Sequence, residues 1–220
     1  VSKDYKGKGF LKLDIGSNVN TNALAEDNFS LQKGPNSFGF SNQANPKTIA
    51  AYDFQSWQLE GKTPVAGSFG ISGGKSFDIG AEGKLSVFAT GSFSNEYTSK
   101  RNGSAKGSVS GDGSLINKNF KTYTSMGYNT NTTGLVNVGY KINNNHKISF
   151  NSLFINSSSQ VKDEYFGYVA DLEDTGNGLI RRSQYVKNTL FVNQLLGEHT
   201  ISSRSKFNWG VAQNNITGDT

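Results

Sequence analysis

The segment from His199 to Gln213, His-Thr-Ile-Ser-Ser-Arg-Ser-Lys-Phe-Asn-Trp-Gly-Val-Ala-Gln, decides the fold class of this chain. Its apolar residues stand at positions 201, 207, 209 and 211, and the residues at 204, 206 and 208 are polar. Because successive side chains of a β-strand point to opposite faces, this alternation predicts a strand with one apolar and one polar face.

Six further segments read as strands, and helical periodicity is nearly absent. They are Gly9–Asn20, Val65–Gly73, Lys84–Asn95, Tyr123–Ile142, Lys147–Gln160 and Tyr185–Leu196. The two faces of the last two segments are ambiguous, because apolar residues occur at both parities. The sequence therefore predicts an all-β fold of about seven strands, several of them longer than the ~5–6 residues usual in globular sheets.

The predicted connections alternate in length along the chain. Short connections are expected at Gly74–Gly83, Asn143–His146 and Gly197–Glu198, and long loops at Thr21–Pro64, Glu96–Thr122 and Val161–Gln184. Long two-faced strands with short turns at one end and long loops at the other are typical of a transmembrane antiparallel β-barrel, with long extracellular loops and short periplasmic turns. The alternative is an antiparallel β-sandwich with one solvated face.

The amino-acid composition is compatible with a barrel wall and argues against a nucleic-acid partner. Hydrophobic residues make up only 34% of the chain and charged residues 18%, while Gly, Ser and Asn together supply about a third. No apolar run approaches the ~18 residues of a membrane-spanning helix, whereas a spanning strand needs only ~9–11 alternating residues. The net charge of +5 comes without any Lys/Arg run longer than two, so no nucleic-acid partner is expected.

The sequence contains few residue patterns typical of catalytic or metal-binding sites. It has no Cys and only two His, at positions 146 and 199, without the spacing of a zinc site or a catalytic triad. The segment from Asp171 to Gly176 opens like a calcium loop, but its twelfth position is Arg182 instead of a carboxylate. We therefore expect no enzyme, no cofactor and no metal site.

On the barrel interpretation, each strand assigns its side chains either to lipid or to the water-filled lumen. Phe207, Trp209 and Val211 are predicted to face lipid. The residues predicted to face the lumen are Lys12, Asp14, Lys141, Arg204 and Lys206. Tyr97, Tyr123 and Tyr128 flank a predicted long loop and Tyr140 lies near a short turn, as in an interfacial aromatic girdle. Aromatic enrichment is also ordinary in β-strands.

One predicted loop, Val161–Gln184, combines aromatic residues with carboxylates. The candidate ligand- or partner-contacting residues are Asp163, Glu164, Tyr165, Phe166, Tyr168, Asp171, Glu173 and Asp174. Exposed aromatics beside carboxylates suit a polar ligand or a partner protein. Packing of the loop onto its neighbours is the alternative.

Two stretches carry a family resemblance. The first runs from Lys141 to Phe154, Lys-Ile-Asn-Asn-Asn-His-Lys-Ile-Ser-Phe-Asn-Ser-Leu-Phe, and the second from Gln194 to Ile201, Gln-Leu-Leu-Gly-Glu-His-Thr-Ile, continuing to Phe207-Asn208-Trp209. Both resemble barrel hairpins of TonB-dependent outer-membrane receptors of the Bacteroidetes type. That family has a 22-stranded barrel filled by an N-terminal plug, and it takes up scarce nutrients with energy passed on by TonB.

The resemblance implies a location in the cell outer membrane and uptake of a bulky ligand, such as an oligosaccharide, a peptide or a metal chelate. Because no plug, TonB box or terminal aromatic is recognisable, residues 1–220 are expected to be a barrel segment of a longer chain, following the plug. Expected partners are outer-membrane lipid, TonB through the missing N-terminal part, and a surface lipoprotein lid or other outer-membrane proteins. The alternatives are a structural subunit of an outer-membrane complex and an extracellular carbohydrate-binding β-sandwich.

Overall fold

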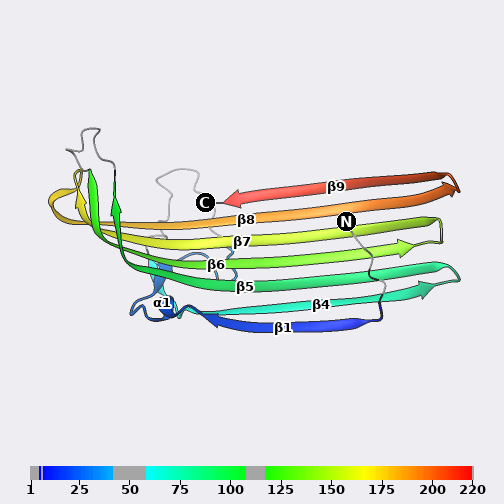
Figure 1. Cartoon of the computed structure of the whole chain (residues 1–220), viewed down its shortest axis with the longest axis horizontal. Coiled ribbons are helices and arrows are strands. Elements are labelled where there is room, and N and C mark those ends of the chain that lie inside the picture. Colours follow the sequence, from blue (N-terminus) through cyan, green and yellow to red (C-terminus); the bar gives the residue numbers. More distant parts are fainter. Residues whose placement is uncertain (1–4, 6, 42–57, 108–116, 220) are drawn as a thin grey trace.

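A computed structural model of the chain describes residues 5, 7–41, 58–107 and 117–219, apart from the side chains of Lys106, Glu173 and Asp174. Seven antiparallel strands form one sheet in the order β1-β4-β5-β6-β7-β8-β9 (Figure 1). The small strands β2 (Ser30–Gln32) and β3 (Leu59–Gly61) pair separately. The predicted all-β class and the seven principal strands are confirmed.

The strands of the main sheet are long, and each follows its sequence neighbour. Their bounds are Phe10–Val19 (β1), Val65–Ile79 (β4), Gly83–Lys106 (β5), Lys118–Lys141 (β6), His146–Val169 (β7), Glu173–Ser202 (β8) and Ser205–Asp219 (β9). At ~3.3 Å per residue, the 24 residues of β6 extend about 80 Å. No helix in the described part of the chain is long and apolar enough to cross a membrane.

The sheet is open. β1 and β9 form its two opposite edges, and neither pairs with the other within the described residues (Figure 1). The connections at residues 80–82, 142–145 and 203–204 lie at one end of the sheet, here called the turn end. The opposite end, here called the far end, holds the connection between β7 and β8. The predicted barrel is therefore seen only as an antiparallel sheet.

Three predicted connections are wrong. Residues 161–184 do not form a long loop, because β7 and β8 continue as a paired hairpin to a tight turn at residues 170–172. Likewise β5 and β6 extend deep into the predicted loop at residues 96–122. Gly197 and Glu198 are not a turn but lie within β8, opposite Trp209 and Asn208. The actual turn, at Ser203 and Arg204, interrupts the segment from which the last strand was predicted.

The register sorts side chains onto two faces. Leu13 lies opposite Ile71, Ile15 opposite Phe69, and Phe69 opposite Phe93. Directly opposed residues share a face, so these apolar side chains form one continuous surface, here called the apolar face. The alternate residues of the same strands, such as Lys12 opposite Ser72, form the polar face.

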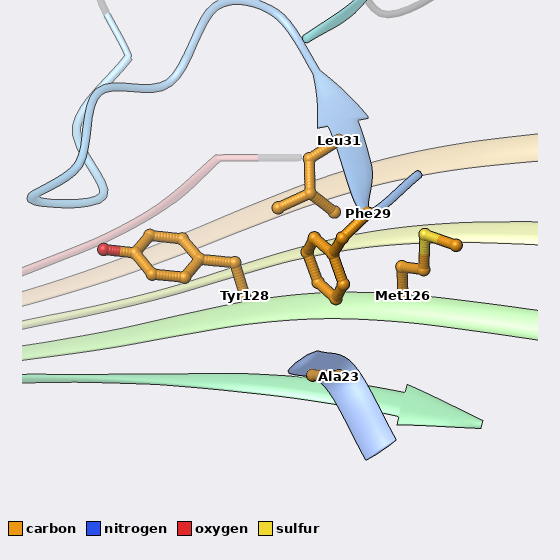
Figure 2. Packing of buried hydrophobic residues seen from close by; sticks show 5 residues of the cluster. All are labelled: Ala23, Phe29, Leu31, Met126 and Tyr128. Carbon is orange, nitrogen blue, oxygen red and sulfur yellow. The ribbon is translucent and has the colours of Figure 1, made fainter. Parts of the chain in front are cut away.

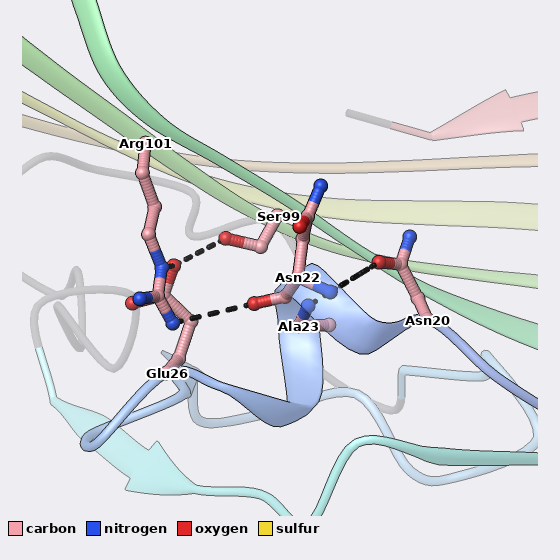
Figure 3. A network of polar contacts seen from close by, with 6 residues as sticks. All are labelled: Asn20, Asn22, Ala23, Glu26, Ser99 and Arg101. Carbon is pink, nitrogen blue, oxygen red and sulfur yellow. Dashed lines mark hydrogen bonds and ion pairs between the residues drawn. The ribbon is translucent and has the colours of Figure 1, made fainter.

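Residues 20–41, here called the strap, leave the end of β1 and lie on the apolar face near the far end. Asn20 begins the single helical turn α1 (Thr21–Leu24), since its side-chain oxygen accepts hydrogen bonds from the backbone of Asn22 and Ala23. Next, Glu26 accepts from Ser99 and forms an ion pair of 2.5 Å with Arg101 on β5 (Figure 3). The strap is thus fastened to the sheet by charge-assisted contacts.

The main apolar core lies between the strap and the sheet. Phe29 and Leu31 point down onto Met126 and Tyr128 of β6, with Ala23 beside them (Figure 2). Leu31 is 1% exposed and Phe29 3%. At about 25 cal/mol per Å², such burial contributes roughly 1.5–3 kcal/mol for each large side chain. The strap is therefore a packed part of the fold.

Candidate functional site

The most unusual surface is the part of the apolar face that the strap does not cover, here called the apolar band. It exposes large hydrophobic side chains on six of the seven strands of the sheet, β5 being the exception. They include Leu11, Leu13, Ile15, Val19, Phe69, Ile71, Phe77, Val136, Phe150, Phe191, Leu195, Phe207 and Val211. Ile15 is 91% exposed and Val211 66%. Contiguous apolar surface of this extent marks an interaction site.

The limit of the apolar band runs obliquely across the strands. In β1 the last apolar residue of this face is Val19. Ile15 is level with Phe93 of β5, and Val19 lies four residues further toward the far end. In β9 the last is Val211, which the register places level with Val87. The limit therefore shifts by about ten residues along β5 over six strand-to-strand steps. At ~3.3 Å per residue and ~4.8 Å per step, this slope is about 45–50°.

Beyond this limit the apolar face becomes polar. Along β7 the outward positions change from Phe150 and Phe154 to Asn156, Ser158 and Gln160. These polar side chains lie under or beside the strap: the Thr130 hydroxyl on β6, hydrogen-bonded to Ser158 at 2.7 Å, also donates to the Phe38 carbonyl. One face thus changes its chemistry along a single strand.

Lys162 is buried beneath the strap. Its side chain is 5% exposed, and its ammonium donates to the Ser30 hydroxyl at 2.8 Å. Burial lowers the pKa of Lys162, while Glu164, 3.9 Å away, partly opposes that shift. The strap therefore covers a cation whose charged form is disfavoured there.

The polar face is built from small residues. Ser86, Asn137 and Ser149 are buried in it, and the Asn137 amide donates to Asn151 at 2.6 Å. Lys12, Asp14 and Lys141 lie on it as predicted, and so does Lys206, opposite Thr200. Arg204 lies in a turn and belongs to neither face.

Some apolar residues also lie on the polar face. Leu153 and Val192 are directly opposed in the middle of the sheet, as are Ile155 and Leu190. This placement explains why the faces of these two strands are ambiguous in the sequence. Phe88 does not fit the alternation of its strand. Its ring packs near the rings of Tyr5 and Phe10 on the polar face, with ring centroids 6.3–6.4 Å from the Phe88 centroid.

The predicted site residues lie on the far hairpin of β7 and β8, on two different faces. Asp163 and Tyr165 lie on the polar face with Tyr123 of β6. The Tyr123 hydroxyl donates to Asp163 at 3.0 Å, and the Tyr123 and Tyr165 rings stack with centroids 4.8 Å apart. Phe120 packs against Tyr165 at 5.1 Å. These four side chains form what we call the aromatic cluster.

Burial and neighbouring groups act on the Tyr165 phenol of the aromatic cluster. Burial raises the pKa of Tyr165, and the neighbouring Asp163 carboxylate and Tyr123 raise it further. The phenol therefore stays a hydrogen-bond donor at neutral pH, beside a carboxylate acceptor. Flat aromatic surface with a carboxylate can bind a polyhydroxylated ligand such as a sugar.

The other predicted site residues are not part of this cluster. Glu164 points to the opposite face, where it forms an ion pair of 2.8 Å with Arg181. Phe166 is exposed on β7, Tyr168 is half-buried, and Asp171 lies in the turn. Glu173 and Asp174 begin β8, and their side chains lie outside the described part of the structure. The prediction missed Tyr123 and Phe120, which precede the site by some 40 residues.

The three tyrosines that flank the predicted long loop do not lie together on one exposed face, whereas Tyr140 lies on the apolar face near the turn end, so an aromatic girdle stays a prediction. The Tyr97 and Tyr128 rings pack in a tilted arrangement under the strap, with centroids 4.6 Å apart, and burial raises the pKa of both phenols. Tyr128 also donates to the Ser37 carbonyl at 2.5 Å. Tyr123 lies on the polar face. Tyr97 and Tyr128 therefore pack beneath the strap, and Tyr123 is part of the aromatic cluster.

The two histidines meet at the turn end. Their Nδ1 atoms lie 3.0 Å apart, and Trp209 Nε1 donates to His199 Nε2 at 2.9 Å. Since His199 accepts at Nε2, its proton is on Nδ1 and is donated to His146 Nδ1. This relay occupies the lone pairs that a metal would need. Among the described residues, no group of three or more His, Cys, Asp or Glu side chains could hold a metal ion.

In comparisons with known proteins, no family model matches the chain, and no curated protein or solved structure is significantly similar to it. Inferences about function therefore rest on the surfaces described above.

Proposed function

We propose that the chain forms part of the wall of an outer-membrane β-barrel, in a TonB-dependent receptor that takes up a bulky nutrient ligand. The observation that carries this proposal is the oblique apolar band. Strands of transmembrane barrels are inclined by ~35–45° to the membrane normal, so lipid contact ends at a different residue on each strand. The slope of about 45–50° at the limit of the band is close to that inclination.

A second observation supports lipid as the medium of the apolar band. In water, the band would leave large apolar side chains on six strands hydrated, at a cost of ~25 cal/mol per Å². A β-sandwich would cover such a face with a second sheet. Within the described residues, the second sheet is only the β2–β3 pair, and it lies near the far end. The sandwich alternative is therefore the poorer explanation.

The barrel proposal requires further strands at the edges β1 and β9, because an unpaired backbone group costs several kcal/mol in hydrocarbon. On this proposal the polar face is the lumen wall, the turn end is periplasmic and the far end is extracellular. The aromatic cluster then lies on the lumen side near the entrance, where it can bind an incoming oligosaccharide. TonB, a plug and a lipoprotein lid remain partners proposed from the family resemblance.

The second candidate function is a structural subunit of an outer-membrane complex. It is favoured by the length of β7, since about ten of its 24 residues suffice to span a membrane. The remainder, with the strap on its outer side, offers an extended extracellular surface to partner proteins. Growth of a deletion strain on candidate nutrients separates the two functions, because only a transporter is needed for uptake.

Spin labels at Trp209, Val211 and Lys206 test the membrane proposal in the full protein embedded in its membrane. Labels at 209 and 211 should be accessible to oxygen dissolved in lipid, and a label at 206 to a water-soluble nickel chelate. Water exposure at 209 and 211 together with lipid exposure at 206 would reverse the faces. Release of the protein from membranes by carbonate would exclude a barrel.

A further inference from the structure

The polar face carries a row of lysines at the turn end. Lys84 lies directly opposite Lys141, and Lys141 directly opposite Lys147, so three neighbouring strands present ammonium groups side by side. Like charges directly opposed across strands are destabilising. On the next strand, β8, the residue directly opposite Lys147 is Glu198.

Two carboxylates of the described residues lie near the row. Lys147 lies 3.7 Å from Glu198, and Lys84 lies 3.7 Å from Asp78, whose side chain is 84% exposed. The Lys141 ammonium donates to the neutral amide oxygen of Asn144 at 2.6 Å. Among the described residues, the three lysines of the row thus lie beside two carboxylates, each at 3.7 Å.

This row borders a cavity of about 290 Å³ between the hairpin ends, here called the basic pocket. Its charged lining residues are Lys141, Lys147, Lys206 and Glu198. Three ammonium groups therefore face one carboxylate. Asparagine and threonine side chains supply further hydrogen-bond donors around the same space. Its volume is at the lower end of the range for small-molecule sites.

The walls of the basic pocket are held in place before any ligand binds. Asn143 Oδ1 accepts the backbone N–H groups of Asn145 and His146, both at 2.9 Å. The Asn145 carbonyl accepts from the Thr200 N–H at 2.7 Å, which ties the hairpin end to β8. His146 and His199 are engaged in their relay with Trp209, so they offer no lone pair to a metal cation. The pocket therefore presents positive charge and donors.

We propose that the basic pocket binds a compact, multiply charged oxyanion, a phosphate or diphosphate group. The three lysines act as point charges, which suit phosphate, and no arginine lines the pocket to favour a planar carboxylate. A bound phosphate removes the like-charge repulsion of the row. The site lies on the polar face, so it stands apart from the lipid contact of the apolar band.

Titration calorimetry of the full protein in detergent, with inorganic pyrophosphate at low salt, tests the site. We expect saturable binding at one site. Lys141→Gln combined with Lys206→Gln should weaken it at least tenfold, whereas Glu198→Gln should strengthen it by removing the carboxylate of the pocket. Lys12→Gln is the matched control, because Lys12 lies on the same face outside the pocket, paired with Asp14 at 2.7 Å.

A gain of pyrophosphate affinity in Glu198→Gln would show that the variant is folded, because a misfolded variant would not bind more tightly. It would also show that the pocket's own carboxylate opposes binding, which distinguishes binding at the pocket from general charge attraction. No binding at millimolar pyrophosphate, or equal losses in Lys12→Gln and in the double variant, would overturn the proposal. Bicelles containing phosphatidic acid are the second arm. Binding of pyrophosphate alone assigns the site to free phosphates, and binding of both ligands at the pocket extends it to lipid phosphate.

Discussion

At the scale of single residues, Gly39 decides how the strap is seated. Its φ of 78° lies in the left-handed region, and a Cβ there would collide with the hydroxyls of Ser158 and Thr130. Its carbonyl accepts from the Tyr185 hydroxyl at 2.8 Å. We expect Gly39→Ala to lower the free energy of unfolding by about 1–3 kcal/mol, measured by urea titration. Gly61→Ala, where a Cβ meets nothing within 4 Å, should change it by less than ~0.5 kcal/mol.

Lys162 should make stability depend on pH. Its folded pKa is lowered by burial, so between that value and the ordinary ~10.4 the unfolded chain binds more protons than the folded one. The free energy of unfolding should therefore rise as pH increases through that interval. Lys162→Met should flatten this rise in urea titrations at successive pH values. The exposed Lys121 is the control, and a Lys121→Met variant that lost the rise equally would contradict the assignment.

At the scale of strands, period-two alternation located every member of the main sheet but not its ends. The signal is strong where one face is apolar, as in residues 205–213. It fades beyond the apolar band, where both faces of β7 are polar, as at Ser157, Ser158 and Ser159. The sequence predicts this strand only as far as Gln160 and a loop after it, although β7 pairs with β6 and β8 up to Val169.

The aromatic cluster could be predicted only in part for a related reason. Asp163 and Tyr165 stand out in the sequence because aromatic and acidic residues are close together there. Tyr123 belongs to the same cluster through the register of β6 against β7, which the turn between these strands sets, and Phe120 joins it through the bulge between Phe120 and Thr122. Because the sequence predicts a loop over residues 161–184, it does not place Glu164 and Asp163 on opposite faces of a strand, where the structure has them.

Arginine substitutions at two neighbouring positions of β9 compare the environments of the two faces of the sheet. Val211 is 66% exposed on the apolar band, and Ala212 is exposed on the polar face. In a bilayer, Val211→Arg should cost about 2–4 kcal/mol near the midplane and less near the interface, and Ala212→Arg should cost little. Unfolding by urea from lipid vesicles measures both. Equal, small effects would place both faces in water.

At the scale of the whole molecule, the open edges of the sheet predict how the isolated segment behaves. β1 and β9 each present a row of unpaired N–H and C=O groups within the described fold, which favours association with other strands. Residues 1–220 refolded alone in detergent should give heterogeneous or aggregated species on native gels. A monodisperse monomer that melts cooperatively without detergent would contradict the barrel proposal and favour a soluble sheet protein.

The meander order of the sheet also has a kinetic consequence. From β4 to β9, every strand docks on the one that precedes it, so each hairpin can zip onto the last with little chain to bring together. β1 is different, because residues 20–64 separate it from β4. Closing that interval costs about 2 kcal/mol more than closing a three-residue turn. The ten-residue β1 should therefore join last during folding and detach first under mechanical load.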